Sequence, residues 1–351
     1  MAATGTPKFA RGGPRLRGII RKYWNAFEEK LSPYQSGRTV LRGIGALALR
    51  LQYRERCDIS FVDGAWEYYW PDATIISPRV ILQWARPEQF GLETRARLED
   101  AYCFEHLPQA GDTVLNVGAG LGCELFAFSR LVRPNGKIFA FEPHPLTFSL
   151  VSRAAAANNW PNVELINAAI VDNSGSTMIS DEADFTVRSV VTGSGIEVPA
   201  ISIDDFIEKR GIERVDFLTM NIEGAERLAI RGMERSFAKV AHVCICCHDF
   251  IGDPEKATRN VVIAWLEQHG FVVTVQQTSP WPSVRDYVYG SRAIDAKPSP
   301  GSAISAQRTL SMMQPRDGAT TPGCSRPASR RGTAHCLAVH QLSRQSQDPR
   351  S

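Results

Sequence analysis

The chain has few features of a secreted, membrane-spanning or repetitive protein. Its eight cysteines follow no regular disulfide framework, and we recognise no secretory signal with an apolar core and a small-residue cleavage site. The apolar stretch at 40–51 is interrupted by Arg42 and Arg50, and it is shorter than the roughly 20 residues that a bilayer-spanning helix needs. No internal repeat is found. We therefore expect a cytoplasmic protein with reduced cysteines.

A cysteine-rich segment at 241–250, AHVCICCHDF, lacks the spacing of a metal site. In one extended strand, Cys244, Cys246 and His248 point to one face and Cys247 to the other. A single strand does not easily wrap a tetrahedral ion, and no second ligand pair with C-x-x-C spacing is present. We predict no metal here and interpret the cysteines as buried thiols. His248 follows the strand and is either a base facing a substrate site or an ordinary satisfied or solvated histidine.

Charge is distributed unevenly along the chain. The 351 residues include 40 Lys/Arg and 37 Asp/Glu, which gives a formal net charge of +3. Residues 1–56 hold 12 basic and 3 acidic side chains, residues 291–351 hold 9 and 3, and residues 57–290 hold 19 and 31. Because acidic side chains repel phosphate groups, the acidic middle of the chain argues against a nucleic-acid groove in that region. We therefore expect no nucleic-acid partner.

A strand, a glycine-rich turn, a helix and a second strand lie within residues 113–143, TVLNVGAGLGCELFAFSRLVRPNGKIFAFEP. Glycines allow a tight turn and let a ligand approach the backbone, while the start of the following helix offers N–H groups to an anionic group. Glu142 ends the second strand roughly 20 residues beyond the glycines, where a carboxylate accepts the hydroxyls of a ribose. This layout is typical of a nucleoside-cofactor pocket.

The glycine spacing helps to choose the cofactor. A dinucleotide fingerprint, G-x-G-x-x-G, requires a third glycine at position 123, which is Cys123. This weakens a nicotinamide or flavin interpretation without excluding it. S-adenosyl-L-methionine has no phosphates, and its chain needs a less strict glycine turn. The spacing therefore favours a methyl donor.

Five segments in order resemble the FkbM family of S-adenosylmethionine-dependent methyltransferases, over about residues 108–273. They are LNVGAG (115–120), FAFEPHP (139–145), VELINAAI (163–170), ISIDDF (201–206) and DFLTMNIEGAERLAIRGM (216–233). The resemblance implies an α/β, Rossmann-like class I methyltransferase fold, with a mostly parallel sheet and helices on both faces. It also implies O-methylation of a hydroxyl on a small molecule or glycan.

The resemblance and the pocket together suggest site residues. The catalytic candidates are Glu223, Asn221 and His248. Glu223 is the first candidate for a base or for a group that orients the acceptor. Its alternative role is to satisfy a turn or to cap the next helix. The cofactor-binding candidates lie at the ends of three strands: Asn116, Gly118, Ala119, Gly120, Leu121, Glu142, Pro143, Asn167 and Ala168.

Two segments depart from the family pattern. The first strand usually ends D-V-G-A-N and the later motif usually reads K-x-D-x-E-G-A-E, but this chain reads NVGAG at 116–120 and MNIEGAE at 220–226. Asn116 and Asn221 replace two carboxylates, and the family's lysine is missing before or at Met220. A carboxamide hydrogen-bonds but neither holds a negative charge nor takes a proton. A catalytically impaired cofactor-binding or scaffold protein of the same fold therefore stays open as an alternative. A nicotinamide-dependent oxidoreductase is a third, less favoured one.

Four segments organise the chain. We expect a basic N-terminal helical extension at 1–56, a hairpin and helix at 57–107, the S-adenosylmethionine-binding methyltransferase domain at 108–290 and a disordered tail at 291–351. Within the domain the pattern alternates between strands and helices. After the first two strands we predict a helix at 148–157, a third strand at 163–170, an inserted hairpin at 172–200, a helix at 203–210, a strand at 215–220, a helix at 225–232, a strand at 240–247, a helix at 256–269 and a strand at 271–276.

The N-terminal extension has an amphipathic pattern. Apolar side chains recur at helical spacing, namely Leu16, Ile19, Ile20, Tyr23, Trp24 and Phe27, with arginines and lysines between them. A basic amphipathic helix of this kind suits two roles. It lies on an anionic membrane through residues 15–30, or it docks its stripe on the core of its own domain. An arginine-rich, acid-poor start is also typical of an organelle transit peptide. The sequence does not indicate the oligomeric state.

Two strands flanking Asp63 and Gly64, at 58–62 and 65–70, have the signal of a β-hairpin. The second strand is rich in aromatic residues: Trp66, Tyr68, Tyr69 and Trp70. These rings either form a stacking platform for a ring-containing acceptor or close a hydrophobic lid.

Overall fold

The computed structural model describes residues 14–53, 57–71, 73–81, 101–181, 190, 195–252, 257–279 and 282–293. Contacts divide the chain into a unit at Met1–Ser299 and a second at Pro300–Ser351, and all described residues belong to the first. The helix expected within 57–107 and the tail beyond residue 293 lie outside the described residues. Among the described residues, no helix is both long enough and apolar enough to cross a bilayer.

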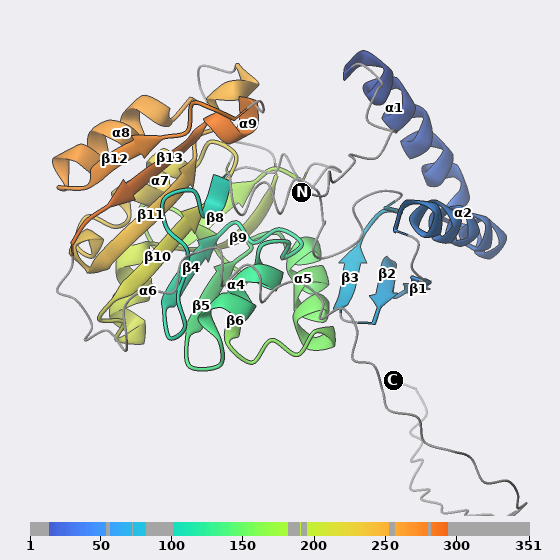
Figure 1. The fold of residues 1–351 in the computed structure, drawn as a ribbon, viewed down its shortest axis with the longest axis horizontal. Coiled ribbons are helices and arrows are strands. Elements are labelled where there is room, and N and C mark those ends of the chain that lie inside the picture. The colour runs from blue at the N-terminus through green and yellow to red at the C-terminus, as the bar shows by residue number, and fades with distance from the viewer. Residues whose placement is uncertain are drawn as a thin grey trace, which may run out of the picture. The chain divides into compact units, whose positions relative to one another are not determined.

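A seven-stranded sheet forms the centre of the domain, in the order β12-β13-β11-β10-β4-β5-β6 (Figure 1). The bounds are β4 Thr113–Val117, β5 Lys137–Phe141, β6 Val163–Ile166, β10 Val215–Met220, β11 Val240–Cys246, β12 Val272–Val275 and β13 Tyr287–Ser291. Neighbouring strands from β6 to β11 pair in parallel, and β13 runs antiparallel to both β11 and β12. The expected mostly parallel α/β fold is confirmed.

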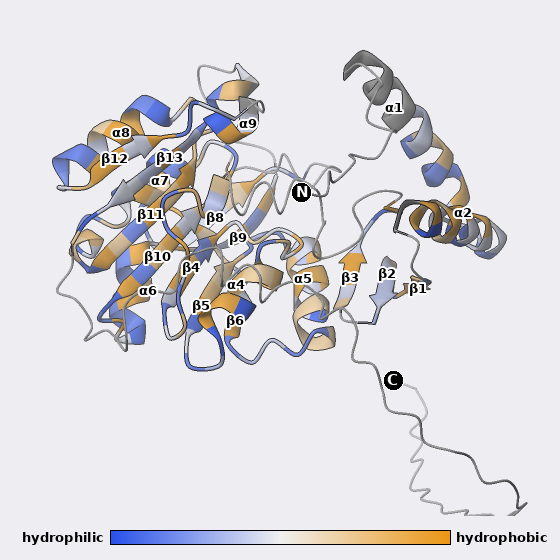
Figure 2. Cartoon of the chain, in the orientation of Figure 1, coloured by the Kyte–Doolittle hydropathy of each residue, from blue (hydrophilic) through white to orange (hydrophobic). Residues whose placement is uncertain are grey.

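Helices connect the strands and cover the sheet. They are α4 Leu125–Val132, α5 Pro145–Ala157, α6 Ile203–Arg210, α7 Glu226–Arg231, α8 Arg259–Gln268 and the short α9 Pro282–Arg285. All six residues of β10 are buried, so both faces of the sheet are covered at its centre, as parallel strands require. Hydrophobic residues accordingly predominate along the central strands in Figure 2.

The chain order reverses between β4 and β10. From β4 the chain proceeds outward to β5 and β6, and it returns to the other side of β4 with β10 and β11. In open α/β sheets, ligands bind outside the carboxyl ends of the strands at such a reversal. The turn after β4 and the loop after β10 are therefore the segments from which the site is built.

The prediction of one strand at 163–170 was wrong. β6 ends at Ile166, and Ala169–Ile170 form β7, which belongs to a separate three-stranded sheet in the order β7-β9-β8. The amide of Asn167 between them donates to the backbone carbonyls of Glu142 and Pro143, which takes the chain out of the first sheet. The other strands, β8 Gly175–Ile179 and β9 Ile196–Ile201, are antiparallel and form the expected inserted hairpin.

The N-terminal segments build a smaller layer. It contains α1 Pro14–Leu31, α2 Gln35–Tyr53 and an antiparallel sheet of β1 Asp58–Val62, β2 Ala65–Trp70 and β3 Ala73–Ser77. β1 and β2 are the predicted hairpin. The sheet packs on α5, where the Asn158 side chain exchanges two hydrogen bonds with the backbone of Thr74, at 2.9 and 2.7 Å.

The aromatic residues of β2 do not form an exposed stacking platform. Trp66, Tyr68 and Trp70 are buried in a cluster with Leu41 and Leu49 of α2, as a hydrophobic lid would be. Tyr69 of the same strand is exposed, and its hydroxyl is hydrogen-bonded to the carboxylate of Glu67.

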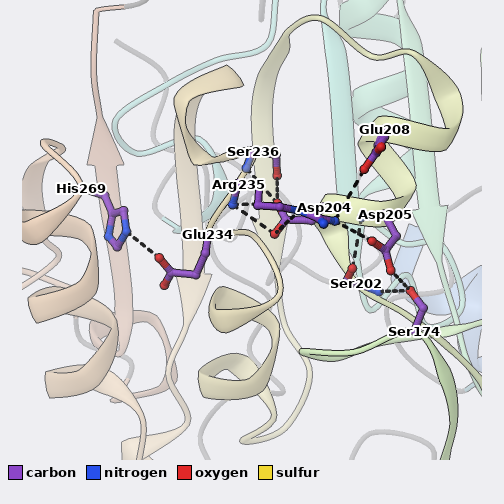
Figure 3. Close-up of polar contacts among 9 residues, drawn as sticks. All are labelled: Ser174, Ser202, Asp204, Asp205, Glu208, Glu234, Arg235, Ser236 and His269. Atoms are coloured by element: carbon purple, nitrogen blue, oxygen red, sulfur yellow. Dashed lines mark hydrogen bonds and ion pairs between the residues drawn. The ribbon is translucent and has the colours of Figure 1, made fainter.

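A polar network fixes the start of α6 to the segment after α7 (Figure 3). The buried Asp204 carboxylate accepts hydrogen bonds from the backbone N–H groups of Arg235 and Ser236 and from the Ser236 hydroxyl. Ser202 caps the helix by accepting from the N–H of Asp205 at 3.1 Å. Asp204 therefore links the start of α6 to backbone and hydroxyl donors of the segment after α7.

Two histidines stack near the amino-terminal end of β11. The His106 and His242 rings are 3.8 Å apart and nearly parallel, and His242 Nδ1 lies 2.9 Å from the Ser291 hydroxyl. Burial and the neighbouring His106 lower the pKa of His242 from 6.5 to about 4, while Asp112 and Asp216 oppose this shift.

Stability is accordingly expected to fall in mild acid. Because the folded pKa lies below the unfolded value, the unfolded chain binds more protons between pH 6.5 and 4, so the contribution of His242 is full above pH 6.5 and is lost toward pH 4. Urea unfolding at several pH values measures this, and His242→Gln should flatten the pH dependence. Parallel curves for the two proteins would contradict it.

Candidate active site

Two loops meet at the carboxyl ends of β4 and β10. The backbone N–H of Asn221 donates to the carbonyl of Val117 at 3.0 Å. Gly118 has a positive φ of 87°, and a Cβ there would collide with the carbonyl oxygen of Asn221. Only glycine allows the two loops to approach this closely. The glycine turn and the segment carrying Glu223 are thereby held next to each other.

The glycine turn offers space rather than free N–H groups. The N–H groups of Gly118 and Ala119 both donate to the carbonyl of Phe141, and that of Gly120 donates to the Glu142 carboxylate. A Cβ on Gly120, whose φ is 54°, would meet no atom within 4 Å. The backbone at Gly120 is therefore open to a ligand. The side chain of Leu121, in contrast, is buried in an apolar cluster with Leu150.

Glu142 ends β5 beside this open space. The carboxylate is buried and accepts from the N–H groups of Gly120 and His144, each at 3.0 Å. A carboxylate at the end of this strand is the group that accepts the hydroxyls of a ribose in such folds. Asn167 fixes the backbone carbonyls of Glu142 and Pro143, and Ala168 next to it is buried.

The start of α4 differs from the anion-binding helix end that the sequence predicted. We expected this helix end to welcome an anionic group, but Glu124 occupies the N-cap position and its carboxylate is buried. The Asn116 amide donates to Glu124 Oε1 at 3.1 Å and to the Thr219 hydroxyl oxygen at 3.0 Å. Because the protein places its own carboxylate there, an added anion would meet repulsion at this point.

Both carboxamides that replace the family's carboxylates keep an unused acceptor. Asn221 donates to the Tyr102 hydroxyl at 3.2 Å, yet the Oδ1 atoms of Asn116 and Asn221 are both buried without a hydrogen-bond partner. Buried acceptors without partners are costly. The ammonium and hydroxyl groups of S-adenosylmethionine are hydrogen-bond donors, so this arrangement fits that cofactor.

Glu223, His248 and Glu226 form a hydrogen-bonded group at the ends of β10 and β11. His248 Nε2 lies 3.2 Å from Glu223 Oε1, and His248 Nδ1 lies 3.0 Å from Glu226 Oε1. The side chains of His248 and Glu226 are buried, whereas 21% of the Glu223 side chain is exposed. Glu223 is therefore the member of the group that a substrate can reach.

The electrostatics of this group favour a charged histidine. Burial lowers the pKa of His248, but Cys246 and the carboxylates of Glu223 and Glu226 outweigh it, so the pKa is raised above its ordinary value. Glu223 and His248 also share a left-handed backbone, with φ values of 56° and 57°. Non-glycine residues in this conformation are strained and often mark functional sites.

The structure thus brings Glu223 and His248 into contact and places Asn221 on the same loop. It does not leave His248 free to act as a base, since both ring nitrogens face carboxylates. We did not select Glu124, Thr219, Tyr102 or Glu226 from the sequence. Only Glu226 had a signal there, as the last acidic residue of the IEGAE segment.

A cavity of about 390 Å³ borders Asp249 and Phe250, the two residues that follow His248 in the chain. It opens among the segments that follow β11 and β12 and precede β13, and its lining residues are Asp249, Phe250, Arg259, Gln276, Gln277, Arg285 and Asp286. Among the residues that the structure describes, no three His, Cys, Asp or Glu side chains are grouped to hold a metal ion. Burial raises the pKa values of the Cys244 and Cys247 thiols, which suits buried neutral groups.

The chain is similar in sequence to known methyltransferases. The family model described as the methyltransferase FkbM domain matches residues 116–273. The chain is 26% identical over 202 residues to 31-O-demethyl-FK506 methyltransferase FkbM of Streptomyces tacrolimicus, covering 48% of this chain and 75% of that protein. It is 24% identical over 213 residues to methyltransferase sdnD of Sordaria araneosa, covering 50% of this chain and 79% of that protein.

Among solved structures, methyltransferase FkbM from Methylobacillus flagellatus KT matches with a TM-score of 0.39 and 14% identity. The match covers 55% of this chain and 47% of that one, so it spans about half of the crystallised protein. The family match, the strand order and the open turn beside Glu142 agree with one another. The chain therefore contains a methyltransferase domain that uses S-adenosyl-L-methionine, and residues 116–273 of it match the FkbM domain model.

Proposed function

We propose that this methyltransferase methylates a hydroxyl oxygen of a small molecule or glycan, with Glu223 as the proton acceptor. The observation that carries the proposal is the partly exposed Glu223 carboxylate, held by His248 at the carboxyl edge of the sheet. One relative is named for a 31-O-demethyl substrate, which supports an oxygen acceptor. The polar lining of the cavity that borders Asp249 and Phe250 suits a hydroxylated molecule.

Glu223 acts on the acceptor hydroxyl. When bound, S-adenosylmethionine supplies a methyl group activated by its sulfonium. A neutral hydroxyl is a weak nucleophile, so a carboxylate that takes its proton as the new O–C bond forms accelerates the transfer. His248, charged between two carboxylates, fixes one oxygen of Glu223 and leaves the other for the hydroxyl. We assign His248 as a positioning residue rather than as the base.

Gly120, Glu142 and Asn116 would hold the cofactor. Gly120 gives access to the backbone, Glu142 accepts the ribose hydroxyls, and Asn116 offers its unpaired Oδ1 to a donor. Pro143, Asn167 and Ala168 shape the neighbouring strand ends, with Asn167 acting through the backbone that it fixes.

Replacing Gly120 by alanine should weaken cofactor binding by about tenfold or more, because the new methyl group enters the space left open for the ligand. Calorimetry with S-adenosylmethionine measures this. Gly211→Ala is the matched control: Gly211 has a φ of 59° and open space too, but it caps the end of α6. Both variants should lose about 1 kcal/mol of stability, and equal cofactor affinity in the two would refute the role of Gly120.

The acceptor class is tested with a methyl-labelled donor. The full chain is incubated with fractions of cell extract, and labelled products are identified by mass spectrometry. The proposal expects methyl ethers. Label on nitrogen or carbon would refute O-methylation, while binding of the cofactor without transfer to any acceptor would favour the catalytically impaired alternative.

A further inference from the structure

Helix α2 has two apolar faces, of which one is exposed. Leu41, Gly45 and Leu49 are buried against the small sheet. Val40, Leu47 and Leu51 lie on another face at spacings of seven and four residues, and 50%, 59% and 74% of their surfaces are exposed. These three aliphatic side chains do not take part in packing α2 on its own domain, and such an exposed apolar stripe is typical of an interaction surface.

Helix α1 and the turn after it add exposed rings. Trp24 and Leu31 pack against the small sheet's core, and the buried Glu28 carboxylate accepts from the N–H of Val80 at 2.7 Å. Tyr23 and Phe27, four residues apart, are exposed by 73% and 42%, and the Tyr34 ring is also exposed. The side chains of residues 14–22, which form the first part of the predicted stripe, lie outside the described residues.

The exposed charges around these apolar side chains are mostly positive. Lys30, Arg42 and Arg50 are exposed on α1 and α2, while Glu29 is the exposed acidic residue among the described side chains of these helices. Apolar stripes with basic neighbours match an anionic bilayer, in which aliphatic and aromatic groups enter the interface and cations meet lipid phosphates. A second protein copy would bring like charges together.

We propose that α2, with the exposed rings of α1 and Tyr34, binds the surface of an anionic membrane. This surface consists of Tyr23, Phe27, Tyr34, Val40, Leu47 and Leu51 with the basic Lys30 and Arg50. The proposal does not rest on the proposed acceptor. It places methylation at a membrane surface. The initial expectation of membrane contact through residues 15–30 is thereby extended to α2, which supplies the aliphatic stripe.

Vesicle sedimentation of the full chain tests the proposal. Binding is expected to vesicles of phosphatidylcholine mixed with phosphatidylserine, to be weak with phosphatidylcholine alone and to decrease with salt. Val40→Gln, Leu47→Gln and Leu51→Gln combined should lower partitioning by about tenfold or more. Lys30→Gln and Arg50→Gln should lower it by about fivefold each. Thermal unfolding of each variant verifies that it is folded.

Two control variants test whether loss of exposed valines or of positive charge elsewhere on the chain also weakens vesicle binding. Val261→Gln with Val272→Gln removes exposed valines of α8 and β12, and Arg130→Gln with Lys209→Gln removes the same charge from α4 and α6. Both should bind like the unmodified chain. The proposal is overturned if the full chain does not bind the vesicles, or if the α2 variants bind them as well as the unmodified chain does. It is also overturned if the triple α2 variant loses self-association but keeps its vesicle binding, because the stripe would then bind a second copy of the chain.

Discussion

Replacing Glu223 by glutamine is expected to lower kcat by about 10²- to 10⁴-fold, the range for loss of a general base. Glutamine keeps the shape and hydrogen-bonding ability of the side chain but does not accept a proton. Because Glu223 is not among the groups assigned to the cofactor, the affinity for S-adenosylmethionine should stay within about threefold. Single-turnover transfer of a labelled methyl group and calorimetry provide the two measurements.

The control for this variant is Glu213→Gln, since Glu213 is 87% exposed and pairs with Lys239 away from the glycine turn. It should leave kcat unchanged. His248→Gln should lower kcat less than Glu223→Gln and shift the pH–rate profile, because the imidazolium that holds Glu223 is lost. If Glu223→Gln retains full turnover, Glu223 only satisfies its turn and the base lies elsewhere.

Replacing Asp204 by alanine is expected to lower the free energy of unfolding by about 2–4 kcal/mol, because buried donors lose a charged acceptor. The Asp204 side chain is 9% exposed, and the N–H of Ser236 is 2.8 Å and its hydroxyl 2.6 Å from Asp204 Oδ1. Alanine would remove the acceptor of the buried Ser236 hydroxyl and leave the Ser236 N–H with only the longer bond to the Met233 carbonyl, at 3.3 Å. Urea denaturation monitored by circular dichroism measures the change.

Glu208→Ala is the control on the same helix, since Glu208 is 78% exposed and reaches only Arg235, at 3.7 Å. It should change stability much less than Asp204→Ala does, because exposed ion pairs contribute little. Equal effects of the two substitutions would show that the charge on α6, rather than the buried hydrogen bonds, is what stabilises this region.

Local signals in the sequence predicted much of the domain. β1 and β2 were predicted at their observed bounds from the runs that flank Asp63-Gly64, and β4 and β5 are the two strands predicted within residues 113–143. Helix α6 was also predicted at its observed bounds, 203–210; in the structure Ser202 caps its start and the left-handed Gly211 ends it. These elements are specified by neighbours in the chain, so a single sequence suffices.

Elements that depend on distant partners were missed. β13 lies between β11 and β12, and β3 pairs with β2, although neither short segment has a strong pattern of its own. The break after Ile166 depends on hydrogen bonds from Asn167 to residues 24 and 25 positions away. Pairing across such separations is decided by tertiary packing, which overrides local preference.

In the candidate site, too, features set by local sequence were predicted, whereas features set by distant partners were not. The motifs predicted that Gly118, Gly120 and Glu142 lie together, because parallel strand ends share one edge of the sheet. They did not predict Glu124 at the start of α4 or the contact of both Glu223 and Glu226 with His248. Buried acidic residues receive their roles from partners brought by folding, and the sequence shows only their positions.

A calorimetric titration of the full chain with S-adenosylmethionine and S-adenosylhomocysteine tests the central claim most directly. The account predicts binding of one molecule per chain with a dissociation constant between about 1 and 100 µM, in the usual range for enzyme substrates. This binding should be weakened in Gly120→Ala but not in Gly211→Ala. Absence of binding at millimolar cofactor, or tight binding of NAD without affinity for the methyl donor, would contradict it.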